Sequence, residues 1–301
     1  MLFRSSLSQV LAEWGASGDK EGMMNSPRGI AISQSGILYV ADLNNNRIIM
    51  YDKDGKALGS FGQKGDKKGE FKEPSGVAVD QEGNVYVADA WNGRIQKFDS
   101  KGKYILEVGG QKAGFYSPRN CAVSKHGILY VADTGTSRVH RFDTEGNRLG
   151  NPVGGQGKAL DKFNEVFSVA FDSKGRVYVS DVGNRRIVVL TSDLRPVAQI
   201  KVRSWEEAFP LWPMLAVDGN DMLYATCSGS KDISVFDTKD KKLKCVGVIK
   251  TDAKDKPIFS DPVGITVDKD NFIYVSEVSR NRIVKILPIF GALAPQYKEQ
   301  G

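Results

Sequence analysis

The sequence predicts an all-β fold in which six four-stranded antiparallel sheets, called blades below, close into a six-bladed β-propeller. The first observation is a sequence motif that recurs about every 44–50 residues. It consists of apolar strand residues around a tyrosine, an acidic or polar residue that ends the strand (the stop residue), a tight turn and a basic residue. The stop residues of the six copies are Asp42, Asp89, Asp133, Asp181, Cys227 and Glu277. The second observation is that turn residues divide each copy into four short strand signals. Such sheets bury their faces only when several stack radially, which favours a closed array.

The second copy shows the four expected strands in order. They are residues 76–80 (innermost), 85–88, 94–98 and 103–108 (outermost). Glycine, asparagine and aspartate separate them, at 81–84, 92–93 and 99–102. Glycine supplies the positive φ angles that tight turns need, and the short polar side chains bond back to their own backbone.

The two ends of the chain are predicted to meet in one sheet. Residues 10–15 match the outermost strands at 57–62 and 105–110, yet they precede the first innermost strand. The repeat pattern of the sixth copy ends after Leu287. We therefore expect residues near 8–14 to complete blade six, which removes the open edge of a linear array. The expected organisation is a single propeller over residues 7–290 with a C-terminal tail at 291–301.

The repeats resemble the NHL-repeat family of six-bladed propellers. The resemblance rests on the Tyr-Val-Ala-Asp strand, the Asn-x-Arg-Ile strand, and a lead that reads Gly62, Gly65, Phe71, Pro74 and Gly76 in the second copy. It spans roughly residues 7 to 287. The pattern departs in blade four, where Val166 and Phe167 replace the Pro-x pair, and throughout blade five.

Composition indicates a globular chain with a substantial core, since 41% of its 301 residues are hydrophobic. No apolar run approaches the ~20 residues that span a bilayer, and the first ten residues lack the apolar centre of a secretion signal. Cys121, Cys227 and Cys245 show neither metal-ligand spacing nor a disulfide framework. We expect a monomeric domain without membrane insertion; the compartment stays open.

The repeated acidic and basic residues are predicted to be scaffold. Six near-equivalent sets cannot each be an active site. Asp42, Asp89, Asp133 and Asp181 are instead expected to accept bonds from turn amides or from arginines.

Catalysis is not expected from the sequence. Lyases and lactonases occur on propellers that resemble this one, and the resemblance would require histidine ligands or a Glu/Asn/Asp cage around a metal. The chain has two histidines, His126 and His140, both expected at the surface. The innermost strands are small and apolar, with Asn120 as their carboxamide. The prediction is therefore no catalytic residue, no metal and no cofactor.

A binding surface remains, on the face that carries the loops leading into the innermost strands. The residue after each lead proline is expected at the channel mouth there, where Arg28 and Arg119 would be anionic anchors. Further basic residues of the same face are Lys64, Lys67, Lys68 and Lys112. The chain has 42 basic and 36 acidic residues, and this net positive charge also favours an anionic partner. A lysine surface that only aids solubility is the alternative.

Aromatic residues suggest apolar anchors on the same face. Trp205 and Trp212 lie in the aberrant lead loop of blade five, and Trp91 lies in a turn of blade two. The alternative is that the blade-five loop plugs a weakened core.

The predicted function is a non-catalytic binding or scaffold propeller for an acidic protein or peptide. Single-stranded RNA on the same face is the first alternative. A metal-dependent hydrolase or lyase is the second.

Overall fold

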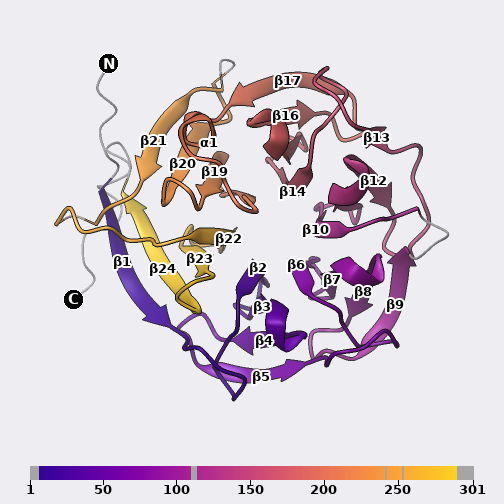
Figure 1. Cartoon of the computed structure of the whole chain (residues 1–301), viewed down its shortest axis with the longest axis vertical. Helices are drawn as coiled ribbons and strands as arrows, with labels where there is room; N and C mark the ends of the chain where they lie inside the picture. The colour runs from indigo at the N-terminus through magenta and orange to yellow at the C-terminus, as the bar shows by residue number, and fades with distance from the viewer. Residues whose placement is uncertain (1–6, 110–113, 241–242, 253, 290–301) are drawn as a thin grey trace.

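The computed structural model describes residues 7–109, 114–240, 243–252 and 254–289. Six sheets of four antiparallel strands stand radially around one axis (Figure 1). The predicted six-bladed β-propeller is confirmed. Among the described residues no helix is long and apolar enough to cross a bilayer.

The first three blades follow the chain from the axis outward. Blade one consists of β2 (Pro27–Ile32), β3 (Leu38–Asp42), β4 (Arg47–Tyr51) and β5 (Ala57–Phe61). Blade two consists of β6 (Pro74–Val79), β7 (Val85–Asp89), β8 (Arg94–Phe98) and β9 (Tyr104–Gly109). Blade three consists of β10 (Pro118–Val123), β11 (Leu129–Asp133), β12 (Arg138–Phe142) and the short β13 (Val153–Gly154).

The remaining blades complete the ring. Blade four consists of β14 (Val166–Phe171), β15 (Val177–Asp181), β16 (Arg186–Leu190) and β17 (Pro196–Lys201). A short helix, α1 (Arg203–Glu207), leads into blade five, which consists of β18 (Leu215–Val217), β19 (Met222–Cys227), β20 (Asp232–Asp237) and β21 (Cys245–Ile249). Blade six consists of β22 (Pro262–Val267), β23 (Ile273–Glu277), β24 (Arg282–Ile289) and β1 (Leu7–Trp14).

The predicted closure is confirmed. Strand β1 pairs antiparallel with β24, from Leu7 opposite Ile289 to Trp14 opposite Ile283. Trp14 packs edge-on against Tyr274 of blade six and at a tilt against Tyr51 of blade one, so it also joins two blades. The domain boundary at 290 lies outside the described residues and stays a prediction.

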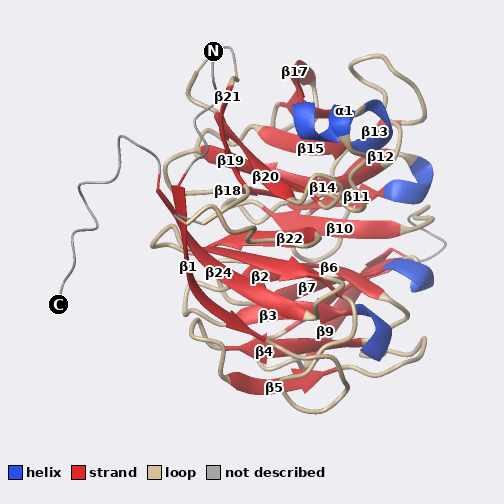
Figure 2. Ribbon diagram, turned by 60° about the vertical axis from the view of Figure 1, so that its left-hand side comes forward, coloured by secondary structure: helices blue, strands red, loops and turns tan. Residues whose placement is uncertain are grey.

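Short helical turns mark one face of the ring. After the second strand of blades one to four come η1 (Leu43–Asn45), η2 (Ala90–Asn92), η3 (Thr134–Thr136) and η4 (Val182–Asn184). Each ends at a left-handed residue, such as Gly93 with φ 64°. These turns and α1 lie on one side of the molecule (blue in Figure 2), which we call the loop face.

Hydrogen bonds explain why the stop residue is acidic. Asp89 is fully buried; it accepts from the Lys72 amide at 2.8 Å and from Arg94 Nε at 2.9 Å. Arg94 also donates to the carbonyls of Lys67 and Glu70, so one pair ties the lead loop to the blade. The same acid–arginine pair recurs in blades one, four and six. The predicted scaffold role of these aspartates is confirmed.

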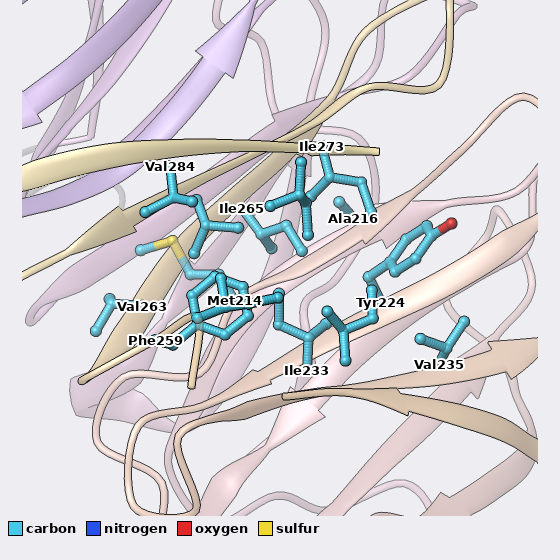
Figure 3. Close-up of a cluster of buried hydrophobic side chains, with 14 of the residues drawn as sticks. Met214, Ala216, Tyr224, Ile233, Val235, Phe259, Val263, Ile265, Ile273 and Val284 are labelled. Atoms are coloured by element: carbon cyan, nitrogen blue, oxygen red, sulfur yellow. The ribbon is translucent and has the colours of Figure 1, made fainter. Parts of the chain in front are cut away.

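The core consists of apolar clusters between neighbouring blades. Side chains of β2 to β4 interlock with those of β6 to β8, for example, through Tyr39, Phe71 and Phe98. Figure 3 shows the cluster in which blade five, with Met214 and Ile233, meets blade six, with Phe259 and Ile265. Each blade is therefore stabilised by its neighbours on both sides.

Glycine is required where the innermost strands converge. A Cβ on Gly29 would come within 2.7 Å of Gly76 Cα, and one on Gly264 within 2.1 Å of the Arg28 carbonyl oxygen. Blades three, four and five carry Asn120, Ser168 and Met214 at this level, and these three side chains line the axis. The axis is therefore asymmetric, with larger groups on one half.

Candidate functional site

The loop-face end of the axis is filled by the residues that follow the lead proline of each blade, or that follow Val166 and Trp212 where the proline is replaced. Five of them are buried, namely Arg28, Ser75, Phe167, Pro213 and Val263. Arg119 is partly exposed. The predicted channel mouth is thus a closed end, in which two arginines lie among neutral side chains.

Arg28 is the most unusual of these residues. Only 9% of it is exposed, and its Nε and Nη1 are buried with no hydrogen-bond partner among the described residues. Its guanidinium carbon lies 3.4 Å from the centroid of the Trp212 ring. Stacking on an aromatic face offsets part of the lost hydration, but it does not satisfy N–H donors. A buried cation left in this way is costly.

The electrostatics of Arg28 show the same cost. Burial, and next the positive charge of Arg119, lower the pKa of Arg28 to about 10. The carboxylates of Asp261 and Glu73 raise this pKa and offset the lowering only partly. Both also accept hydrogen bonds from other groups. Asp261 accepts from the amide and hydroxyl of Ser279, and Glu73 accepts from Trp91 Nε1. Neither arginine forms an ion pair within the described part of the chain.

The backbone of Trp212, which covers Arg28, is left-handed. Its φ is 52°, in the left-handed region that bulky residues rarely adopt. The side chain is half-buried against the core cluster of blades five and six. The preceding loop is anchored by the Leu211 amide, which donates to Ser228 Oγ at 2.8 Å.

The other two tryptophans lie elsewhere. Trp205 is fully buried in the core cluster between blades four and five, and it donates from Nε1 to the Thr226 carbonyl of blade five at 3.0 Å. It plugs the blade, as the alternative interpretation of this loop expected. Trp91 is 67% exposed on the loop face and bonds to Glu73. Of the three, the structure brings Trp212 against Arg28.

The basic residues of blade two are not gathered at the axis. Lys64, Lys67 and Lys68 are exposed in the loop between β5 and β6. The Lys68 ammonium lies 5.5 Å from the ring of Tyr104, on the outermost strand of that blade. Lys68 therefore lies near the rim, while Lys112 lies outside the described residues.

Beneath the closed end, the innermost strands surround a cavity of about 260 Å³. Asn120 Nδ2 lies 3.7 Å from Met214 Sδ across the axis. Each innermost strand is the edge of its sheet, so its unpaired backbone groups face the cavity. Cys121 is fully buried, and burial raises the pKa of its thiol to about 12, which makes it unreactive as a nucleophile.

The prediction that His140 lies at the surface is wrong. His140 is 3% exposed, packed edge-on against Phe115 and stacked on Phe142. It replaces Gln96 of blade two in the repeat, and blade three lacks the acid–arginine pair of its neighbours. Within the described ranges, no three His, Cys, Asp or Glu side chains come together as metal ligands would.

Comparison with known proteins assigns the repeats. The NHL repeat pattern matches residues 24–49, 71–98 and 259–286. The protein is therefore a six-bladed β-propeller, and three of its six repeats match the NHL repeat. NHL propellers are generally protein-interaction domains. Over 45 residues, or 15% of this chain, the sequence is 42% identical to RING finger protein nhl-1 of Caenorhabditis elegans, of which this stretch covers 5%.

Solved structures of the same fold include enzymes. Streptogramin B lyase superimposes with a TM-score of 0.65 at 14% identity, covering 93% of this chain and 98% of that chain. A gluconolactonase from Xanthomonas campestris superimposes with a TM-score of 0.63 at 16% identity, covering 89% and 88%. At these identities the likeness shows the fold alone.

Two predictions are corrected by these neighbours. The sequence predicts a non-catalytic scaffold for a protein or peptide, and no enzyme. Both are wrong, because the structural neighbours are lyases and a lactonase built on the same propeller. The absence of a histidine cluster from the sequence is not evidence against every kind of catalysis. RNA binding has no support among the proteins named here.

Proposed function

We propose that the protein binds a small organic carboxylate at the loop-face end of its axis, with Arg28 as the principal cation. The observation that carries the proposal is the buried Arg28 guanidinium with two unpartnered donor atoms. A carboxylate there would accept hydrogen bonds from these two Arg28 atoms. Those bonds would compensate for the hydration that Arg28 loses on burial. Arg119 adds a second positive charge, and the guanidinium fork suits a planar carboxylate.

Trp212 controls access to this site. Since Nε and Nη1 of Arg28 are buried, a ligand reaches them only when a covering side chain moves. Trp212 lies directly on the guanidinium, and its left-handed backbone is costly to maintain. Movement of Trp212 on binding therefore changes the environment of an indole, which intrinsic fluorescence reports.

The test is a calorimetric titration with small mono- and dicarboxylates, followed in parallel by fluorescence. Arg28→Met is expected to lower affinity by roughly 10- to 150-fold, the equivalent of one hydrogen bond to a charged group. The same variant should keep or raise the melting temperature, because it replaces an unpaired buried charge with an apolar chain. A structural arginine would behave in the opposite way.

Arg280→Met is the matched control. Arg280 is exposed in a loop-face turn of blade six and forms no ion pair with a described residue. If Arg28→Met binds carboxylates as the native chain does, the proposal is wrong. An acidic peptide that binds while every small carboxylate fails would refute the small ligand. Proton NMR of the bound compound over time then distinguishes a ligand from a substrate.

A further inference from the structure

A second basic hollow lies away from the axis, at the loop-face edge of blade four. Its volume is about 310 Å³, and its lining includes Lys158, Arg185, Arg186, Gln199, Lys201 and Glu206. These residues come from the lead loop of blade four, the turn after β15, strands β16 and β17, and helix α1. We call it the blade-four pocket.

Three of its cations are free of acidic partners. Lys158, Arg185 and Lys201 are exposed and form no ion pair with any described residue. Arg186 is neutralised by Asp181, to which Nε donates at 2.7 Å. Glu206 is the one carboxylate of the lining, and it contributes its backbone carbonyl to Arg185. The pocket therefore carries an excess of positive charge.

The other blades show that the repeat does not require this charge. In blade two, Asp66 corresponds to Lys158, because Asn92 and Asn184 donate to the carbonyls of the glycines just before these two residues. Glu107 corresponds to Gln199, because Arg94 and Arg186 donate to these two side chains. Gly109 takes the place of Lys201, because Arg94 and Arg186 face these residues in register. The same structural position is acidic in blade two and basic in blade four.

The turn residue of blade four adds a further cation. Arg185 has a φ of 55°, where blades one, two, three and six place Asn46, Gly93, Ser137 and Asn281, and blade five places Lys231. Asparagine and glycine accept this left-handed conformation readily, whereas arginine accepts it at a cost. A strained cation beside two unpaired lysines has no evident value for the fold.

We propose that the blade-four pocket binds a phosphate or sulfate group carried by a small molecule. Three unpaired cations match a group of two or more negative charges with several acceptor oxygens. A volume of about 310 Å³ lies at the lower end of small-ligand pockets and accommodates the oxyanion with part of its carrier. This site is separate from the carboxylate site at the axis and does not depend on it.

The test uses pyrophosphate as the probe and converts the pocket to the residues of blade two. The variant Lys158→Asp/Arg185→Gly/Lys201→Gly should fold, since blade two folds with these residues. We expect it to lose at least ten-fold in pyrophosphate affinity by calorimetry, with no fall in melting temperature. Arg28→Met should bind pyrophosphate as the native chain does, which separates the two sites.

The control changes the net charge by the same amount elsewhere. Lys254→Asp/Lys256→Asp alters exposed lysines near the outer edge of blade five. Unchanged binding by this control supports the pocket. Equal loss in both variants would mean diffuse attraction and overturn the proposal, as would native affinity in the blade-two conversion. Binding of a short RNA without binding of pyrophosphate would also overturn it.

Discussion

Arginine serves two purposes in this protein, and the difference lies in its partners. Arg94 forms an ion pair with Asp89 and donates to two carbonyls, so it is part of the repeat. Arg28 and Arg119 occupy positions that the repeat leaves free, and neither has an acidic partner among the described residues. Hydrogen-bond satisfaction, more than residue type, distinguishes scaffold from site.

This distinction predicts opposite effects for two substitutions. Arg94→Ala removes the partner of a fully buried carboxylate and should cost about 3–5 kcal/mol of unfolding free energy. Arg119→Ala should cost about 1.5–3 kcal/mol of carboxylate affinity with little change in stability, because the side chain is partly exposed. Melting and calorimetry on both variants check this. The reverse pattern would show that scaffold and site are exchanged.

His140 predicts how stability depends on pH. Burial, and next the charges of Arg148 and Arg138, lower its pKa from 6.5 to about 4. The neutral ring accepts from Arg148 at Nδ1, and Asp133 lies 3.8 Å from Nε2. The unfolded chain binds a proton at His140 more readily than the folded chain does. The contribution of His140 to the free energy of unfolding is therefore present above pH 6.5 and is lost as pH falls toward 4.

Between pH 6.5 and 4, the free energy of unfolding is expected to fall by as much as about 3 kcal/mol. His140→Gln, which places the residue of blade two at this site, should flatten the dependence in urea unfolding between pH 4 and 7. His126→Gln is the control, since His126 is exposed in a turn. An unchanged slope in His140→Gln would contradict the assignment.

At the scale of strands, cations of the third strand join neighbouring blades. The Lys97 ammonium lies 5.2 Å from the Tyr86 ring and donates to the Thr144 carbonyl of blade three. Lys285 lies 5.4 Å from the Tyr274 ring and donates to the Lys53 carbonyl of blade one. These contacts explain why lysine is buried in β8 and β24: its charge is shared by an aromatic face and a carbonyl.

Strand β1 is the element on which closure depends. Deleting residues 1–14 should lower the melting temperature and promote association, because it exposes the edge of β24 and removes the contacts of Trp14. Scanning calorimetry and light scattering measure the two effects. Deleting residues 1–6 keeps β1 and serves as the control. A longer truncation that melts like the full chain and stays monomeric would refute this role.

At the scale of the whole molecule, the repeat predicted the architecture because its requirements are local. Turn residues, the acid–arginine pair and the tyrosine strand are encoded within one unit, and six units close a ring. The match of residues 10–15 to other outermost strands was also visible in the sequence, and it correctly placed β1 in blade six. Arg28 and Arg119 could be selected as well, because their four counterparts in the repeat are neutral.

The environment of each selected residue was decided only by the tertiary structure. Sequence position could not show that Trp205 enters the core while Trp212 covers Arg28, since both belong to one aberrant loop. Nor could it bring together Lys158, Arg185 and Lys201, which come from different segments of blade four. Local patterns determine strands and turns because those depend on near neighbours. Burial, stacking and unpaired charge depend on contacts between distant segments, and these exist only once the ring has closed.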